Sequence, residues 1–274
     1  MVLEEFLNKL GKRKFYSFFL GLLYVFIGYG TASIFFPQNI SLTMIFFITL
    51  LLVPSAIKLI SLEEDKEGRY GVKKFVKNHK VIIEVLLFLF IGVFLGYFIL
   101  GFTGGYENVI SYQQNFLENQ GINETLIDNF LQTDQSKLNK FAGIAISNMG
   151  VSIIAFVLSF FYGIGAIFLI VLNASIFSTF ILFVTQQLGK SLQEILTILG
   201  IFSIYAIPEV AGFLLAAIAG GVISKAVIKE KVGSKRFKNV VKDATLLLLV
   251  SFAVILLSAL LEVFVTGPLI RVLF

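Results

Sequence analysis

The chain has 274 residues, of which 57% are hydrophobic and only 14% charged, and it carries a formal net charge of +5. Its mean hydropathy of +0.92 places it in a membrane, because a water-soluble domain cannot bury so much apolar surface. The absence of cysteine excludes disulfides, thiolate catalysis and Cys-ligated zinc, and the single histidine, His79, excludes any site that needs two imidazoles.

Several apolar stretches are long enough to cross a bilayer, since a spanning helix needs about 20 residues. They cover residues 15–35, 42–60, 81–103, 141–161, 164–184, 207–224 and 244–268. The expected fold class is therefore all-α: a polytopic transmembrane helical bundle of about seven spans (six to eight). We expect residues 1–274 to form a single integral membrane domain.

The distribution of Lys and Arg predicts which way the chain faces. Residues 1–14, 58–80 and 225–242 contain 4, 7 and 7 of the 22 basic residues. We therefore expect a multi-pass protein of the cell membrane with a cytoplasmic N-terminus and an extracytoplasmic C-terminus. Basic cytoplasmic loops at 61–80 and 225–242 would contact anionic lipid heads, and no nucleic-acid-binding signature accompanies the charge.

A polar segment at 104–140 is expected to be an extracytoplasmic loop. Within it, Asn123 is suitably placed to cap a short helix, because apolar residues follow it at helical spacing. We expect this amphipathic helix to lie on the outer membrane surface or on the bundle. The functional alternative is a docking element for an outer partner.

The sixth apolar stretch, 191–224, is longer than one crossing requires and contains Pro208. Because a proline inside a helix removes a hydrogen bond and clashes with the preceding turn, we expect a proline-broken segment with two helices. Residues 191–203 would form an outer interfacial helix or a re-entrant leg. Glu209 would lie in the first turn of the second helix, where the helix dipole stabilises a carboxylate. The functional alternative is a buried acid that binds a partner group, a cation or a proton.

Two asparagines lie within the fourth and fifth spans, which a short turn at 162–165 joins as an antiparallel hairpin. Asn148 and Asn173 can each hydrogen-bond across a helix interface. The structural interpretation is that they hold helices together. The functional alternative is that they line a polar path with Glu209.

Small residues at four-residue spacing predict close helix contacts. Gly92 and Gly96 form a GxxxG step in the third span, and Gly212, Ala216 and Gly220 form a second stripe in the sixth. We expect these stripes to pack helices within one chain. The alternative is that they form the contact of a homo-oligomer, most simply a dimer.

Catalytic constellations are absent from the sequence. HExxH is missing, Gly189-Lys190-Ser191 lacks the upstream glycine of a phosphate loop, and no pair of aspartates lies within the spans. A membrane serine protease needs a histidine at membrane depth, whereas His79 flanks a span and Asp243 stands alone at an inner boundary. We therefore expect no enzyme, no cofactor and no metal site.

The run from Tyr205 to Gly220 resembles a hallmark of the stage II sporulation protein M family. In that family a His-Gly-x-x-Glu-like element opens a helix rich in Ala and Gly, and Glu209 matches the family acid. Tyr205 and Ala206 stand where the family often has His and Gly, so a role that depends on imidazole is not expected here.

A second match concerns the two asparagines. The family shows an Asn, a Gly-rich turn and a second Asn, which correspond to Asn148, residues 163–165 and Asn173. Together the two matches cover residues 148–221. Their order and spacing carry the resemblance more than either motif alone.

The resemblance implies a non-enzymatic integral membrane protein. In spore-forming bacteria the family provides a membrane subunit of a complex that includes cell-wall hydrolases and helps the membrane migrate during engulfment. Members also occur in organisms that make no spores, including archaea, so sporulation is not assumed.

We therefore expect a multi-pass scaffold or complex subunit that anchors an envelope protein partner and acts in membrane remodelling or other envelope processes. The alternative is a small permease or channel subunit whose polar path is lined by Asn148, Asn173 and Glu209. A third interpretation is a structural membrane protein whose polar residues only pack helices.

Overall fold

The computed structural model describes residues 13–119, 137–162, 165–188 and 191–273, and within these residues it contains helices and no strands. Seven of the described helices are long and apolar enough to cross a membrane. Each expected span overlaps one of these helices in the expected order. The prediction of an all-α transmembrane bundle with about seven spans is therefore confirmed.

The helices in chain order are α2 (Arg13–Phe35), α3 (Ile40–Tyr70), α4 (Phe75–Leu100), α5 (Tyr106–Asn119), α7 (Lys137–Tyr162), α8 (Gly165–Leu188), α9 (Leu192–Lys229), α10 (Lys235–Leu261) and α11 (Gly267–Leu273). A 3-10 turn, Gly71–Lys74, joins α3 to α4. π-Helical turns, Gly101–Gly105 and Glu262–Thr266, follow α4 and α10.

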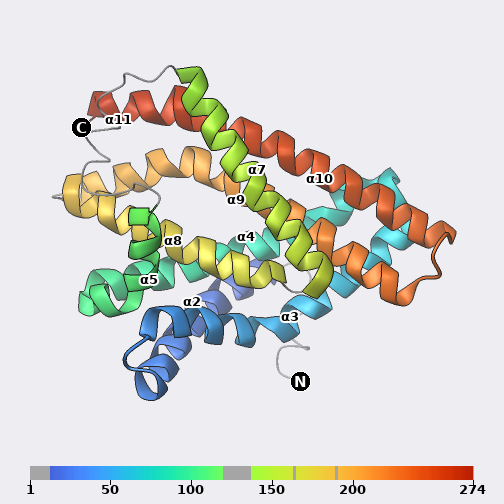
Figure 1. The fold of residues 1–274 in the computed structure, drawn as a ribbon, viewed down its shortest axis with the longest axis horizontal. Coiled ribbons are helices and arrows are strands. Elements are labelled where there is room, and N and C mark those ends of the chain that lie inside the picture. The colour runs from blue at the N-terminus through green and yellow to red at the C-terminus, as the bar shows by residue number, and fades with distance from the viewer. Residues whose placement is uncertain (1–12, 120–136, 163–164, 189–190, 274) are drawn as a thin grey trace.

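The long helices run roughly along one axis of the molecule, so two ends can be distinguished (Figure 1). We call one the α5 end, because α5 and α11 lie there. We call the other the basic end. It carries the connection between α3 and α4 and the connection between α9 and α10. Next to them, the Asn239 side chain of α10 donates a 3.2 Å hydrogen bond to the Gly68 carbonyl of α3.

The segments expected as basic loops are largely helical. α3 continues to Tyr70 and α9 to Lys229, so only short connections remain at Gly71–Lys74 and 230–234. Hydropathy finds the apolar part of a helix, whereas Glu and Lys sustain a helix beyond the membrane about as well as Leu. This is why the helices of the basic end extend past the expected spans.

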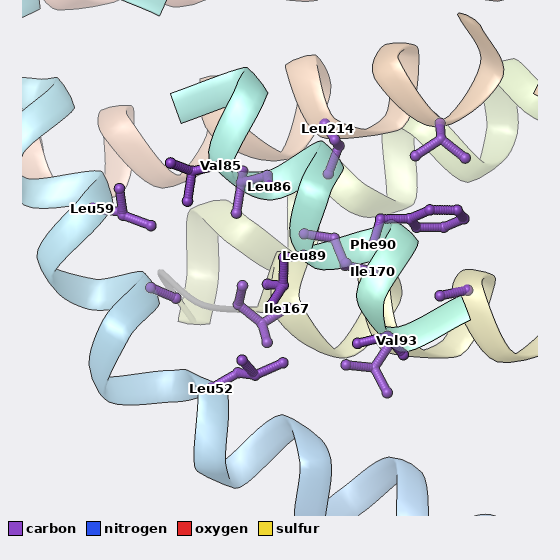
Figure 2. Close-up of a cluster of buried hydrophobic side chains, with 14 of the residues drawn as sticks. Leu52, Leu59, Val85, Leu86, Leu89, Phe90, Val93, Ile167, Ile170 and Leu214 are labelled. Atoms are coloured by element: carbon purple, nitrogen blue, oxygen red, sulfur yellow. The ribbon is translucent and has the colours of Figure 1, made fainter. Parts of the chain in front are cut away.

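An apolar core joins α3, α4, α8 and α9. Figure 2 shows its centre, with labelled side chains from all four helices: Leu52, Leu59, Val85, Leu86, Leu89, Phe90, Val93, Ile167, Ile170 and Leu214. α2 and α7 instead leave large apolar side chains such as Phe19 and Ile146 exposed. Such surfaces suit contact with lipid.

The GxxxG step of α4 packs against α2. A Cβ atom at Gly92 would overlap the carbonyl oxygen of Phe18, and one at Gly96 would lie 2.7 Å from Cβ of Val25. Only glycine permits so close an approach of two helix backbones. This stripe is therefore engaged within the chain.

The stripe of α9 is also engaged within the chain. A Cβ atom at Gly220 would overlap the carbonyl oxygen of Phe156 on α7, and one at Gly212 would lie 2.6 Å from Cγ1 of Ile255 on α10. Ala216 between them is fully buried. The arrangement agrees with the expected packing of helices inside one chain.

The expected break at Pro208 is absent, because α9 is one continuous helix. The proline leaves the carbonyl of Ile204 without its usual N–H donor. The hydroxyl of Ser258 on α10 donates a 2.9 Å hydrogen bond to the neighbouring carbonyl of Tyr205. This bond joins α9 to α10 within one turn of the proline, and packing against neighbouring helices lets a membrane helix continue through a proline.

Residues 191–203 are accordingly neither a separate interfacial helix nor a re-entrant leg. Ser191 caps α9, accepting a hydrogen bond from the backbone N–H of Glu194, while the Glu194 carboxylate accepts from the backbone N–H of Ser191. This reciprocal pair is a capping box, which fixes the helix start. The amphipathic first half is therefore the beginning of α9.

The polar segment 104–140 contains a helix that the sequence did not predict. α5 contacts α3 and α8, and its Val109 and Ile110 are fully buried. Ser41 of α3 donates a 2.5 Å hydrogen bond to Oε1 of Gln113. The helix expected after Asn123 lies outside the described residues.

Candidate functional site

A cavity of about 280 Å³ lies between α7, α8, α9 and the end of α10. It lies in the half of the bundle nearer the α5 end, where Leu117 of α5 forms part of its wall. Its polar lining is formed by Ser147, Asn148, Asn173, Tyr205, Glu209 and Glu262. Its aromatic lining is formed by Phe90, Phe177, Phe180 and Phe213.

Close helix packing brings α7 and α9 together at this cavity. The approach of Gly220 to Phe156 sets the spacing of the two helices toward the basic end. Nearer the α5 end, the side chain of Asn148 lies close enough to that of Glu209 to interact with it. An amide N–H placed there can donate to the carboxylate and so satisfy part of its hydrogen-bonding capacity inside the membrane.

The structure brings together four of the five residues that the sequence proposed as functional. Asn148, Asn173, Tyr205 and Glu209 all line the cavity. Pro208 does not line it, and is half-buried beside Glu209 in the continuous helix. The functional grouping of the two asparagines with Glu209 therefore matches the geometry, although it does not by itself establish a role.

The sequence analysis did not include Glu262 among the candidate residues, although it lines the cavity. The π-helical turn Glu262–Thr266 places this side chain in the cavity wall, close enough to Glu209 for electrostatic interaction. Glu262 also interacts electrostatically with Lys140 of α7. No local sequence signal marks the π turn, so the pairing of the two acids was not predictable.

Between the cavity and the basic end, apolar side chains leave little open space inside the bundle. The next two voids toward the basic end each measure about 10 Å³. Apart from Asn173, every residue that lines them is apolar, including Leu214 and Ala217 of α9 and Ile167 of α8. A void of this size holds at most about one water molecule, and apolar walls do not retain it.

A second polar cluster lies at the basic end and was also missed. Nε2 of His79 lies 2.9 Å from Oδ2 of Asp243, and Nδ1 of the same ring lies 2.8 Å from Oε1 of Glu63. The sequence analysis placed Asp243 alone at an inner boundary, whereas the structure pairs it with His79. Glu63 and Glu67 are four residues apart on one helix face, a spacing that is the one local signal of this cluster.

These features define a multi-pass α-helical membrane protein with a polar cavity inside its bundle. The model of the family described as stage II sporulation protein M matches residues 85–267, more than half of the chain, and the chain therefore belongs to this family. The match includes every residue that lines the cavity. Comparisons with curated proteins and with solved structures found no match.

Proposed function

We propose that this protein is a non-enzymatic membrane subunit of a cell-envelope complex, and that its Glu209 cavity holds a cationic side chain of a partner protein. The N-terminus would be cytoplasmic and the C-terminus extracytoplasmic, since most Lys and Arg lie at the basic end. The cavity would then face the outer half of the membrane. The observation that carries the proposal is the pairing of two acids with aromatic walls inside the bundle.

The charge of the cavity supports a cationic occupant. Glu209 interacts with Glu262 and with Asn148, and among the described residues no Lys or Arg forms an ion pair with it. A carboxylate within a membrane span is costly unless a partner group meets it. The aromatic rings of Phe177, Phe180 and Tyr205 add cation–π attraction for an ammonium or guanidinium group.

The small apolar voids below the cavity favour a binding pocket over a conduit. A permease or channel path along Asn148, Asn173 and Glu209 would have to continue toward the basic end through residues such as Leu214 and Ala217. Both of these side chains are buried in the bundle. The conduit is therefore kept as an outcome of the tests below.

The remaining expectations extend this proposal. Anionic lipid heads would meet the basic end, where the exposed side chains of Lys231, Lys235 and Lys238 supply positive charge. The glycine stripes of α4 and α9 are engaged within the chain, so self-association would use other surfaces. In this proposal, membrane remodelling would follow from the partner.

The test is recovery of partners from the native membrane after mild cross-linking, with Glu209→Gln compared against the parent protein. Glu84→Gln is the matched control, since Glu84 lies on α4 and pairs loosely with Lys80 at 3.9 Å. We expect a stoichiometric partner with the parent and with the control, and recovery reduced about tenfold or more with Glu209→Gln, as loss of a charged hydrogen bond implies.

Two outcomes would contradict the proposal. One is equal recovery of the same partners with Glu209→Gln. The other is flux of ions or solutes through proteoliposomes of the parent protein that Glu209→Gln abolishes, because this would favour the conduit.

A further inference from the structure

The cluster at the basic end joins three helices through buried acids and the one histidine. Glu63 and Glu67 lie on α3, His79 begins the apolar part of α4, and Asp243 lies on α10. The relative exposure of these four side chains is 2% or less. This cluster is separate from the Glu209 cavity and shares no residue with it.

Glu67 is buried without a hydrogen-bond partner. Its side chain is 0% exposed, and neither carboxylate oxygen accepts a hydrogen bond. Its Oε1 lies 3.7 Å from Nδ1 of His79 and so faces into the cluster. An unsatisfied buried carboxylate is energetically costly unless another group meets its charge.

The contact between His79 and Glu63 is also incomplete. Nδ1 of His79 and Oε1 of Glu63 lie 2.8 Å apart, yet neither atom makes a hydrogen bond of good geometry. Nε2 of His79, in contrast, is hydrogen-bonded to Asp243 at 2.9 Å. When Nε2–H donates to Asp243, Nδ1 presents a lone pair toward the two glutamates.

The charges of the cluster do not balance among the described residues. Lys66 contacts Oε2 of Glu63 at 3.2 Å, but no Lys or Arg forms an ion pair with Glu67 or Asp243. Lys229 pairs instead with the neighbouring Glu64, at 2.9 Å. Three buried carboxylates therefore face one imidazole, and negative charge exceeds positive charge in the cluster even with Lys66 counted.

We propose that Glu63, Glu67 and His79 bind one divalent transition-metal ion, with Asp243 as the group that orients the imidazole. One ligand atom from each of the three residues lies within 4.8 Å of the others. Ligand atoms about 2.1 Å from a tetrahedral zinc ion lie about 3.4 Å apart. Nδ1 of His79 lies 2.8 Å from Oε1 of Glu63 and 3.7 Å from Oε1 of Glu67, which brackets that spacing.

The ligand set selects the kind of metal. One imidazole nitrogen with carboxylate oxygens suits Zn²⁺ and its neighbours in the first transition series, whereas Mg²⁺ and Ca²⁺ prefer oxygen ligands alone. The hydrogen bond from His79 to Asp243 is the carboxylate–histidine pair that commonly supports a metal-bound imidazole.

The burial of the ligands indicates a structural role for the ion. All three are closed from solvent, as in structural sites, and they come from two helices, α3 and α4. The ion would tie the end of α3 to the start of α4. Asp243 would extend this connection to α10, next to the Asn239–Gly68 hydrogen bond.

The experiment uses the full chain purified in detergent, without chelator and after removal of any affinity tag. The protein is produced and dialysed with Zn²⁺, freed of excess ion, and its metal content is measured by mass spectrometry. Glu67→Gln removes a ligand, and Glu64→Gln is the matched control, because it is an equally buried acid one helical turn away in the same helix.

We expect about one zinc ion per chain in the parent protein and in Glu64→Gln, and at most about a tenth of that in Glu67→Gln. Asp243→Asn keeps all three ligands and should weaken zinc binding about 10- to 100-fold, a readout that survives if Glu67→Gln fails to fold. Added Mg²⁺ should not displace the zinc.

Two results would overturn the proposal. The first is a parent protein that retains well under one zinc ion per chain after dialysis. The second is retention of the same amount of zinc by Glu67→Gln and by the parent. A failure of either kind leaves the proposed role of the Glu209 cavity untouched, because no residue is shared.

Discussion

The side chain of Asn148 on α7 lies within interaction range of the side chain of Glu209 on α9, and both line one cavity inside the membrane bundle. Gly220 lets α9 pack closely against α7, so the backbones that carry the two side chains are held near each other. The pair therefore joins the packing of the bundle to the chemistry of the cavity.

This relationship predicts a measurable coupling between the two residues. Asn148→Leu and Glu209→Gln should each change the free energy of unfolding, and the double variant should differ from the sum by about 0.6–2 kcal/mol. Unfolding in detergent is the measurement. Asn173→Leu combined with Glu209→Gln is the control pair, and it should be additive to within about 0.5 kcal/mol. Additivity of the Asn148 pair would show that the two side chains do not interact.

The close contact of α9 with α7 predicts a strong position dependence for glycine substitutions. Gly220→Ala should destabilise the bundle by more than about 2 kcal/mol, because its Cβ meets the backbone of Phe156, which cannot give way cheaply. Gly150→Ala is the control, since its Cβ has nothing within 4 Å. It should be neutral or stabilise the protein by up to about 1 kcal/mol. Equal effects in thermal unfolding would argue against this packing.

The sequence gives the number and order of the spans, since apolar length alone decides them. It does not give the course of α9, because the helix near Pro208 packs against α10, where Ser258, fifty positions further along the chain, bonds to the Tyr205 carbonyl. Similarly, the basic end was predicted as loops because hydropathy cannot detect a polar continuation of a helix.

The candidate cavity was predictable in part. Asn148, Asn173 and Glu209 were grouped from their polarity at membrane depth, which is costly and therefore informative. Glu262 was not grouped with them, because its position depends on a π turn. The cluster of His79, Asp243 and the α3 glutamates was missed, since its members are far apart in sequence and only tertiary packing brings them together.

The helix contact at Pro208 predicts a specific cost for losing one hydroxyl. Ser258→Ala removes the hydrogen bond to the Tyr205 carbonyl and should lower the free energy of unfolding by about 1 kcal/mol. Ser178→Ala is the matched control, because the Ser178 hydroxyl is buried without a hydrogen-bond partner. Ser178→Ala should leave the free energy of unfolding unchanged or should raise it. If both variants lowered the free energy of unfolding by a similar amount, the hydrogen bond to the Tyr205 carbonyl would not explain the effect of Ser258→Ala.

The ion pair of Lys229 with Glu64 predicts a contrast between two lysines. Lys229→Met leaves the fully buried Glu64 without its cation and should destabilise the protein by about 1–3 kcal/mol. Lys80→Met breaks a loose, exposed pair with Glu84 and should cost less than about 0.5 kcal/mol. Thermal unfolding at low and high salt checks both, and equal small losses would exclude a structural role for the Glu64 pair.

The most direct test of the proposed role places a photoreactive amino acid in the cavity wall at Ser147, with Ile153 as a lipid-exposed control position on the same helix. Illumination of native membranes is followed by identification of the adducts. The account predicts a protein adduct from position 147 that disappears with Glu209→Gln and is absent from position 153. A protein adduct that persists with Glu209→Gln, or adducts to lipid alone, would contradict the claim that this cavity binds a partner through its acid.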